Sequence, residues 1–327
     1  MELFLGVDGG GTKTSFAVAD RSGNIKGAHT GTGSSYKQLG VDKAVNVLYE
    51  NAIICLDKAG VGLSDLSGVC FGLPCYGENA QGDSALSSAL KERFPKTPAV
   101  FVNDAEIGWA GSFAMQPGVS IAVGTGSIAF GKDSSGKSAR CGGWHEFFSD
   151  EGSCYWLGRR TMELFTKQAD GRARKNHLYR IIREAFSLEE DFAFIDIMES
   201  DYLPYRDKVA SMQIYLEQAS LLGDTGAGEL YVQAAGELAG IVSGIAEQLD
   251  LAKPFPVSYS GGLFKAGALI MDPFSKKVSA LGGAIQKPLL APVHGALLLA
   301  LSESSGGEAP PDDTIRRLAR YMQQEGA

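Results

Sequence analysis

The sequence is poor in the residues that build metal clusters and disulfide frameworks. Its 327 residues include four histidines, which form no cluster, and five cysteines, an odd number without a C-x-x-C pair. Neither a zinc site nor a disulfide scaffold is therefore expected. Free thiols are typical of a reducing compartment, so we expect a cytoplasmic protein whose cysteines are small core residues.

Long apolar runs and clusters of basic residues are missing as well. No apolar run approaches the ~20 residues that span a bilayer, and the N-terminal "MELFLGV" enters a strand without a basic signal-peptide region. The net charge of −8 disfavours nucleic acid or an anionic membrane surface as the partner, because both attract clustered Lys and Arg. The chain is long enough for two domains with buried cores.

Two common nucleotide-binding patterns are absent from the glycine-rich stretch "LGVDGGGTKTSFAVAD" at residues 5–20. The P-loop pattern fails at Thr12, where it requires Lys, and no G-x-G-x-x-G occurs. The residues after the glycines alternate between apolar and polar, which predicts the second strand of a hairpin. A glycine tip can turn successive N–H groups toward one anion, although it also suits a merely flexible turn. The first predicted phosphate-binding turn consists of Gly9, Gly10, Gly11, Thr12, Lys13 and Thr14.

A similar pattern returns at residues 120–137, "SIAVGTGSIAFGKDSSGK", as strand, glycine tip, strand and polar turn. The outer turns "DRSG" and "DSSG" also correspond, which indicates an internal repeat. We therefore expect two similar domains, each with a glycine hairpin, that hold one polyphosphate. The second predicted phosphate-binding turn consists of Thr125, Gly126 and Ser127.

The rest of the pattern predicts an α/β protein. Val45, Leu48, Ala52 and Leu56 form a helical stripe, and "GVCFGLP" and "AVFVND" read as short buried strands with a helix between them. The second half is richer in helix, with apolar stripes near residues 154–167, 208–222 and 229–249. A late helix, a polar linker and a terminal helix follow.

Two aspartates follow predicted strands. Asp8 lies beside the first glycine turn, where Mg²⁺ would relieve its repulsion of a phosphate; the alternative is that it caps its own turn. Asp104 follows "AVFVN" at the carboxyl end of a strand, where α/β proteins place reactive groups. It could act as the base for an attacking hydroxyl, or it could be the N-cap of the next helix.

The stretch "CGGWHEFFSDEGSCYW" at residues 141–156 combines glycines, aromatic residues and acceptors, a mixture that suits a sugar. Gly143, Trp144 and Asp150 are the candidates. The alternative is that Asp150 caps the following helix. We expect most of the aromatic side chains here, including Phe147 and Phe148, to be core.

A glycine pair in "SYSGGLF", Gly261 and Gly262, could bring backbone under a flat base or its ribose. Together with "GVDGGGTKT", "VNDAEIG", "AVGTGS" and the GGW…DEGS stretch, it resembles in order and spacing the BadF/BadG/BcrA/BcrD ATPase family, and within it the N-acetylglucosamine kinase branch. The resemblance covers most of the chain. It implies the fold of actin, Hsp70 and hexokinase: two similar ribonuclease H-like α/β domains flanking an ATP cleft. The implied domains are 1–115, 116–290 with extra helices, and C-terminal helices in 291–327 that pack back on the first domain.

The resemblance also implies roles for individual residues. ATP would be bound by both glycine turns and by Gly261 and Gly262, and Mg²⁺ by Asp8. Asp104 would be the base for the sugar 6-hydroxyl. The implied sugar contacts are Ser35, Asp104, Gly143, Trp144 and Asp150. The implied partners are ATP and a sugar, without nucleic acid or membrane, and a homodimer is compatible with them.

One departure from the family leaves the sugar open. Relatives often carry Asn where this chain has Ser35, and a hydroxyl offers fewer hydrogen-bond sites than an amide. N-acetylglucosamine is the first expectation. Glucosamine, N-acetylmannosamine, N-acetylmuramic acid and glucose are alternatives. Two further alternatives are an ATP-driven activator of a radical dehydratase, as found in the same family, and a non-catalytic sugar sensor.

Overall fold

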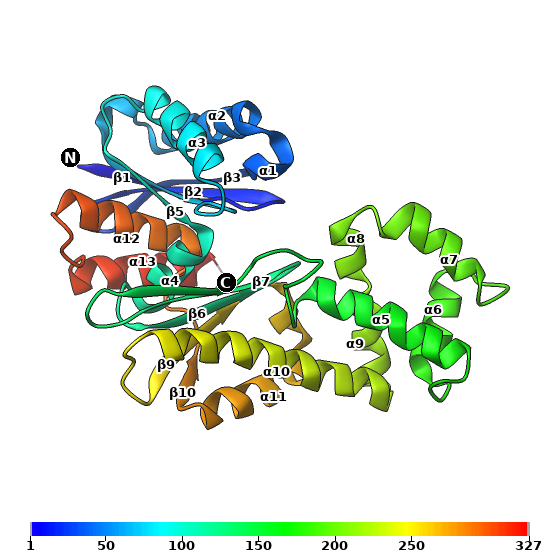
Figure 1. Cartoon of the computed structure of the whole chain (residues 1–327). Coiled ribbons are helices and arrows are strands. Elements are labelled where there is room, and N and C mark those ends of the chain that lie inside the picture. Colours follow the sequence, from blue (N-terminus) through cyan, green and yellow to red (C-terminus); the bar gives the residue numbers. More distant parts are fainter. Residues whose placement is uncertain (1, 326–327) are drawn as a thin grey trace. The chain divides into compact units, whose positions relative to one another are not determined.

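The structure is a computed structural model that describes residues 2–325. The chain forms two compact units (Figure 1). Unit 1 takes in the chain up to Gly118 and again from Lys287, and unit 2 runs from Val119 to Gln286. Within residues 2–325, no helix is both long and apolar enough to cross a membrane.

Unit 1 is built on a five-stranded mixed sheet in the order β3-β2-β1-β4-β5. The β1–β2–β3 meander is antiparallel, and β1, β4 and β5 run parallel. Its elements are β1 (Leu3–Asp8), β2 (Lys13–Asp20), β3 (Ile25–Thr32), α1 (Tyr36–Leu39), α2 (Val41–Ala59), β4 (Leu66–Leu73), α3 (Ala80–Arg93), β5 (Ala99–Asn103), α4 (Asp104–Phe113), α12 (Pro292–Ser304) and α13 (Asp312–Glu325).

The strands of unit 1 separate two apolar layers, as their period of two requires. Leu5 and Val7 of β1 pack in one layer with α2 and α3, whereas Phe4 packs in the other with α4, α12 and α13. The predicted helical stripe is confirmed, since Val45, Leu48, Ala52 and Leu56 are all buried in α2.

Unit 2 repeats this plan around a sheet in the order β10-β9-β6-β7-β8. Read from the opposite edge, this order is β8-β7-β6-β9-β10, and it corresponds strand by strand to β3-β2-β1-β4-β5 of unit 1. Its elements are β6 (Gly118–Val123), β7 (Ser127–Lys132), β8 (Ser138–Gly142), α5 (Cys154–Ala169), α6 (His177–Ala185), α7 (Ala193–Ile197), α8 (Arg206–Ser211), α9 (Gln213–Leu221), α10 (Thr225–Gln248), β9 (Phe255–Ser260), α11 (Ala268–Ala280) and β10 (Gly283–Gln286).

The matched outer turns show the repeat in atomic detail. The Asp20 carboxylate accepts hydrogen bonds from the amides of Ser22 and Asn24. The Asp133 carboxylate accepts the equivalent bonds from Ser135 and Lys137. Burial raises the pKa of Asp20, but the side-chain and backbone hydrogen bonds of Asn24 and the ammonium of Lys26 outweigh it and lower that pKa. The pKa of Asp133 is lowered first by the Ser135 hydroxyl and then by backbone amides, including those of Lys137 and Ser135. The predicted α/β fold with two similar domains is therefore confirmed, and the same local chemistry closes both hairpins.

Two local expectations were wrong. The strand "AVFVN" is only half-buried, because β5 is the edge strand of its sheet. The apolar stripe at 208–222 is not one helix: α8 ends at Ser211 and α9 begins at Gln213. Periodicity does not reveal either feature, since both depend on what packs alongside.

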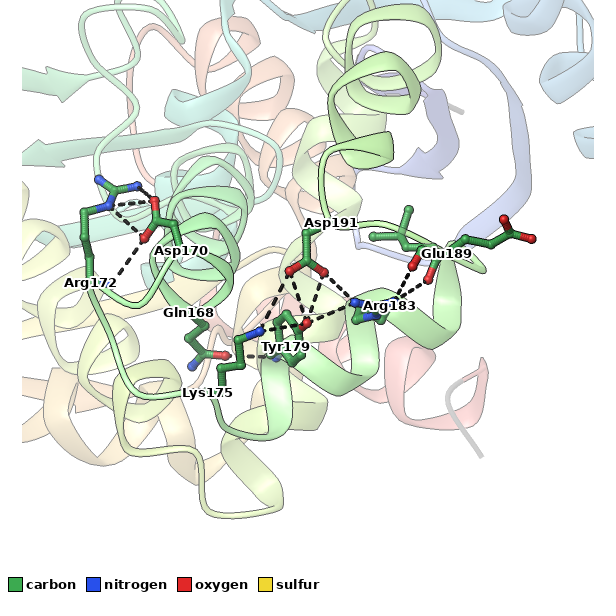
Figure 2. A network of polar contacts seen from close by, with 9 residues as sticks. Gln168, Asp170, Arg172, Lys175, Tyr179, Arg183, Glu189 and Asp191 are labelled. Atoms are coloured by element: carbon green, nitrogen blue, oxygen red, sulfur yellow. Dashed lines mark hydrogen bonds and ion pairs between the residues drawn. The ribbon is translucent and has the colours of Figure 1, made fainter.

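Residues 154–221, which carry α5 to α9, form the helical region of unit 2 (Figure 1). A polar network braces it (Figure 2). The Asp191 carboxylate accepts hydrogen bonds from the Tyr179 hydroxyl and from Arg183, whose guanidinium also donates to the carbonyls of Leu188 and Glu189. The Tyr179 amide donates to Gln168 on α5, so α6 is fixed against its neighbour.

Candidate functional site

In unit 1 the carboxyl ends of three parallel strands meet at one sheet edge. Asp8 at the end of β1 is in register with Gly72 of β4, and Leu73 is in register with Asn103 at the end of β5. By alternation Asp8 faces the α4 side of the sheet. Gly72 belongs to β4, which lies between β1 and β5. A Cβ on Gly72 would come 2.3 Å from Ile107 of α4, so the glycine lets α4 pack closely against the sheet. Asp8 and the start of α4 are thereby brought to the same edge and face.

The carboxyl group of Asp8 is strongly perturbed. Burial and, to a smaller extent, the negative charge of Asp104 raise its pKa to about 7, against the lowering effect of Lys13. Desolvation and a like charge both disfavour the ionised form. A carboxyl group in such surroundings would gain from a bound cation.

Asp104 does not cap its helix. Asn103 is the N-cap of α4, and its side chain accepts a hydrogen bond from the Ala105 amide at 3.0 Å and donates to the Tyr76 carbonyl at 2.9 Å. Asp104 is the first residue of α4, where a carboxylate is stabilised by the helix dipole. The structural alternative for Asp104 was therefore wrong, since capping is done by its neighbour.

The first glycine turn, between β1 and β2, is packed against the segment before α1. The Gly9 amide donates to the Gly72 carbonyl at 2.8 Å, and the Ser34 amide donates to the Gly10 carbonyl at 2.9 Å. A Cβ on Gly9 would lie 2.8 Å from the Ser34 Oγ. Glycine is thus required at this position for close approach.

The side chains around this turn are exposed to different degrees. Gly11, Thr12 and Lys13 are exposed, whereas Thr14 points into the α2 side of the sheet and is buried. Within the described chain, the hydroxyls of Thr14 and Ser34 are buried without a hydrogen-bond partner. Sequence reasoning missed Ser34, because a serine in a loop gives no signal until its packing is known.

Ser35, the predicted sugar contact, is buried and immediately precedes α1. It makes no capping hydrogen bond with its side chain. The next residue anchors the segment: the Tyr36 hydroxyl donates to Asp83 at 3.0 Å, and Asp83 also accepts from the Gly77 amide at 2.9 Å. The Ser35 segment is therefore tied to the loop that follows β4.

In unit 2 the second glycine turn, Gly124–Gly126, joins β6 to β7. The first amides of α5 donate to it, Cys154 to the Gly124 carbonyl at 3.0 Å and Tyr155 to the Thr125 carbonyl at 3.2 Å. Thr125 is half-buried. Ser127 is buried and already engaged, since its hydroxyl donates to the Glu151 carbonyl at 2.8 Å.

The glycine pair after β9 lies at the same edge as this turn. Because β6 and β9 are parallel with Ala122 opposite Ser260, Gly261 lies beside Val123. Gly261 has φ 104°, and a Cβ there would come 2.2 Å from the Val123 carbonyl oxygen, whereas a Cβ on Gly262 would meet nothing within 4 Å. The structure thus brings the second phosphate-turn candidate and the adenosine candidate together within unit 2.

Asp150 lies against the second glycine turn. It is 3% exposed, has φ 59°, and accepts a hydrogen bond from the Ser127 amide at 3.2 Å. Its other carboxylate oxygen is paired with Arg206 of α8, a residue that sequence reasoning missed. Burial raises the pKa of Asp150, while the Ser127 amide and Arg206 lower it. The helix cap after it is Ser153, whose hydroxyl accepts from the Trp156 amide.

The aromatic side chains of the "CGGWHEFFSDEGSCYW" stretch contradict the expectation of a core. Trp144, Phe147 and Phe148 are 78%, 79% and 70% exposed, while Tyr155 and Trp156 are half-buried. Gly143 has φ 66° and a Cβ there would come 3.0 Å from Ile128, so glycine is favoured just before Trp144. Residues 143–153 lie outside helices and strands, and within this segment the Phe148 ring stacks on His145.

The described residues contain no group of three or more His, Cys, Asp or Glu side chains that could hold a metal by themselves. Mg²⁺ does not need such a group, since one or two carboxylates with substrate phosphates and water complete its shell. Asp8 fits that role. All five cysteines are free thiols; Cys55 and Cys70 are core residues as expected, and Cys75, Cys141 and Cys154 are half-buried.

Comparison with known proteins gives a consistent result. The profile of the BadF/BadG/BcrA/BcrD ATPase family matches residues 5–300. An N-acetyl-D-glucosamine kinase of Dictyostelium discoideum is 28% identical over 315 residues, which cover 92% of this chain and 98% of that protein. An N-acetylmuramic acid/N-acetylglucosamine kinase of Clostridium acetobutylicum is 27% identical, covering 84% of this chain and 90% of that one.

A solved structure is similar over almost the same range. A Chromobacterium violaceum protein with the provisional name N-acetylglucosamine kinase has a TM-score of 0.73 and 25% identity, and the match covers 91% of this chain and 98% of that one. The likeness therefore extends over both units rather than over one of them.

Proposed function

We propose that this chain, which belongs to the BadF/BadG/BcrA/BcrD ATPase family, is an ATP-dependent kinase that phosphorylates the 6-hydroxyl of an amino sugar, with N-acetylglucosamine as its first candidate substrate. The names of its relatives in Dictyostelium and Clostridium support a sugar acceptor. The cytoplasmic location inferred from the free thiols is part of the same proposal.

The observation that carries the proposal is the placement of Asp104. It stands at the carboxyl end of β5, on the edge and face that also hold Asp8, and its capping duty is taken by Asn103. A carboxylate in this position can accept the proton of an alcohol. Its negative charge adds to the effect of burial in raising the pKa of Asp8, which supports the proposal that the two carboxyl groups serve one reaction centre.

The proposed reaction requires these residues to accept one proton and to bind the phosphates. The oxygen of the sugar 6-hydroxyl attacks the γ-phosphorus, its proton passes to Asp104, and the bond to the β-phosphate oxygen breaks to release ADP. When bound, Mg²⁺ would neutralise charge on the phosphates. Asp8 would hold it, and backbone amides of the two glycine turns other than those of Gly9 and Ser127 would donate to phosphate oxygens. Gly261 and Gly262 would let the backbone lie under the nucleoside.

The sugar contacts are the least constrained part of the proposal. Ser35 is held in place through Tyr36 and Asp83 in unit 1. In unit 2, Gly143 and Asp150 lie in the segment that presents Trp144 to solvent, where an indole face could pack on a sugar ring. An acetamido group and a free amine differ in charge and size, so activity with N-acetylglucosamine and with glucosamine separates the two acceptors.

The deciding experiment is a panel of acceptors with coupled detection of ADP. N-acetylglucosamine, glucosamine, N-acetylmannosamine, N-acetylmuramic acid and glucose are each supplied with ATP and Mg²⁺, and the product is checked for phosphate on the 6-oxygen. We expect N-acetylglucosamine to give the highest kcat/KM. If ATP is hydrolysed at the same rate with and without each sugar, and the purified protein is brown with the absorbance of an iron–sulfur cluster, the protein is instead a dehydratase activator.

A further inference from the structure

Arg206 connects the segment of Asp150 with a distant part of unit 2. It is the first residue of α8, and its guanidinium pairs with the Asp150 carboxylate and, at 3.5 Å, with Glu146. Asp150 is 3% exposed, whereas the arginine side chain is 42% exposed. One end of this ion pair is therefore buried and the other reaches solvent.

The arginine also touches the second glycine turn. A Cβ on Gly126 would lie 2.8 Å from Arg206 Nη2 and 2.9 Å from both Asp150 carboxylate oxygens. The Ser127 amide holds the first of those oxygens at 3.2 Å. The carboxylate is thus clamped between a backbone amide and a guanidinium, directly over the turn.

The helix that carries Arg206 is itself fixed. A Cβ on Gly158 of α5 would lie 1.9 Å from the Val209 carbonyl oxygen, so α8 approaches α5 backbone to backbone. The network around Asp191 braces α6 against α5 in the same helical region (Figure 2). A guanidinium on such a support loses little freedom when it forms its pair.

We propose that Arg206 is a positioning residue for the sugar site: it holds the Asp150 carboxylate ionised and oriented against the second glycine turn, ready to accept hydroxyl hydrogen bonds from the acceptor sugar. This inference rests on the proposed kinase function. A buried carboxylate without a counter-charge takes up a proton and then offers the sugar one acceptor fewer. Two charged groups act on Asp150: Arg206 from α8 favours its ionised form, and Glu146 from its own segment disfavours it, so removal of the arginine takes away the favourable one.

The test compares Arg206→Gln and Arg206→Lys with wild type. We expect Arg206→Gln to raise KM for the sugar at least about tenfold at pH 7 while KM for ATP changes less than about twofold. The acid limb of kcat/KM for the sugar should move to higher pH, since the pKa of Asp150 rises without its cation. Arg206→Lys keeps a cation and should restore part of the affinity.

The matched control is Arg160→Gln on α5. That side chain is also 42% exposed and also ion-paired, but with Glu163, whose side chain is 37% exposed rather than buried. Equal sugar KM and equal pH profiles in Arg206→Gln and Arg160→Gln would overturn the positioning role while leaving the kinase function intact. A loss confined to KM for ATP would overturn it too, as would a lower Tm with an unmoved acid limb. If wild type neither binds nor phosphorylates any sugar of the panel, both proposals fall.

Discussion

At the scale of single residues, the proposed reaction depends on one carboxylate. Asp104→Asn keeps the size of the side chain and removes its basicity. We expect kcat to fall about 10²–10⁴-fold, because proton transfer from the 6-hydroxyl loses its acceptor, while the affinity for ATP stays close to that of wild type. Steady-state kinetics and nucleotide titration by calorimetry measure the two quantities.

Glu92→Gln serves as the control, since Glu92 is an exposed carboxylate at the end of α3 in the same unit. It should leave kcat unchanged. Parallel losses of turnover and ATP affinity in Asp104→Asn would mean that the residue supports the fold of the site rather than the proton transfer.

The raised pKa of Asp8 makes a prediction about stability. Its folded pKa of about 7 exceeds the ordinary value of 3.8, so the folded protein binds this proton more tightly than the unfolded chain. The contribution to stability is full below pH 4 and is lost as the pH rises through 7. Asp8→Asn cannot ionise. We therefore expect it to be more stable than wild type at pH 8, by about 2–4 kcal/mol, and to match wild type near pH 4.

Urea unfolding at a series of pH values measures this difference. The exposed Asp42 provides the comparison variant, Asp42→Asn, for which the difference from wild type should stay small throughout. A gap between Asp8→Asn and wild type that does not widen from pH 4 to pH 8 would show that Asp8 ionises normally in the folded protein.

For single residues, the sequence predicted where candidate side chains lie along the strands better than it predicted which residues contact them. Asp8 and Asp104 stand out because each follows a recognisable strand, and strand ends are where α/β proteins place reactive groups. Arg206 and Ser34 could not be found in the same way. Their relevance arises from contacts across 56 and 24 residues of chain, with Asp150 and with the Gly10 carbonyl, and no local pattern encodes such contacts.

At the scale of elements, the turn after β9 contains two adjacent glycines, and only the first of them lacks room for a side chain. Gly261→Ala forces an alanine to φ 104° with its Cβ against the Val123 carbonyl, so we expect a loss of at least about 2 kcal/mol of unfolding free energy. Gly262→Ala meets open space and should unfold within about 0.5 kcal/mol of wild type. Chemical denaturation of the two neighbours side by side measures the contrast, and similar values for both would refute it.

The elements themselves were largely predictable where periodicity is strong. The stripe of α2 and the two glycine hairpins follow from apolar spacing and turn chemistry. The exposed Trp144 was not predictable, because an aromatic residue in a loop has the same sequence signature as one in a core. Trp144 follows two glycines with positive φ, Gly142 and Gly143, in a segment outside helices and strands.

At the scale of the whole molecule, the family likeness extends over both units, and the duplication explains why one local design occurs twice. Each unit has the same strand order and an aspartate-closed outer turn, at Asp20 and at Asp133. Unit 1 is nevertheless discontinuous in sequence, because α12 and α13, which complete it, follow unit 2 in the chain. Its second apolar layer therefore joins residues nearly 300 positions apart, such as Phe4 and Leu298.

This connectivity predicts which elements lose hydrogen-exchange protection when a core side chain is truncated. Leu298 of α12 is fully buried in that layer, so Leu298→Ala should cost about 2–5 kcal/mol. Leu238 of α10 is equally buried in the core of unit 2 and provides a matched Leu238→Ala variant. Because each layer belongs to one unit, hydrogen exchange should rise in β1, α4 and α12 for the first variant and in α5, α10 and β9 for the second. Identical exchange maps for the two variants would show that the whole chain opens as one cooperative block, and that the division into units has no thermodynamic counterpart.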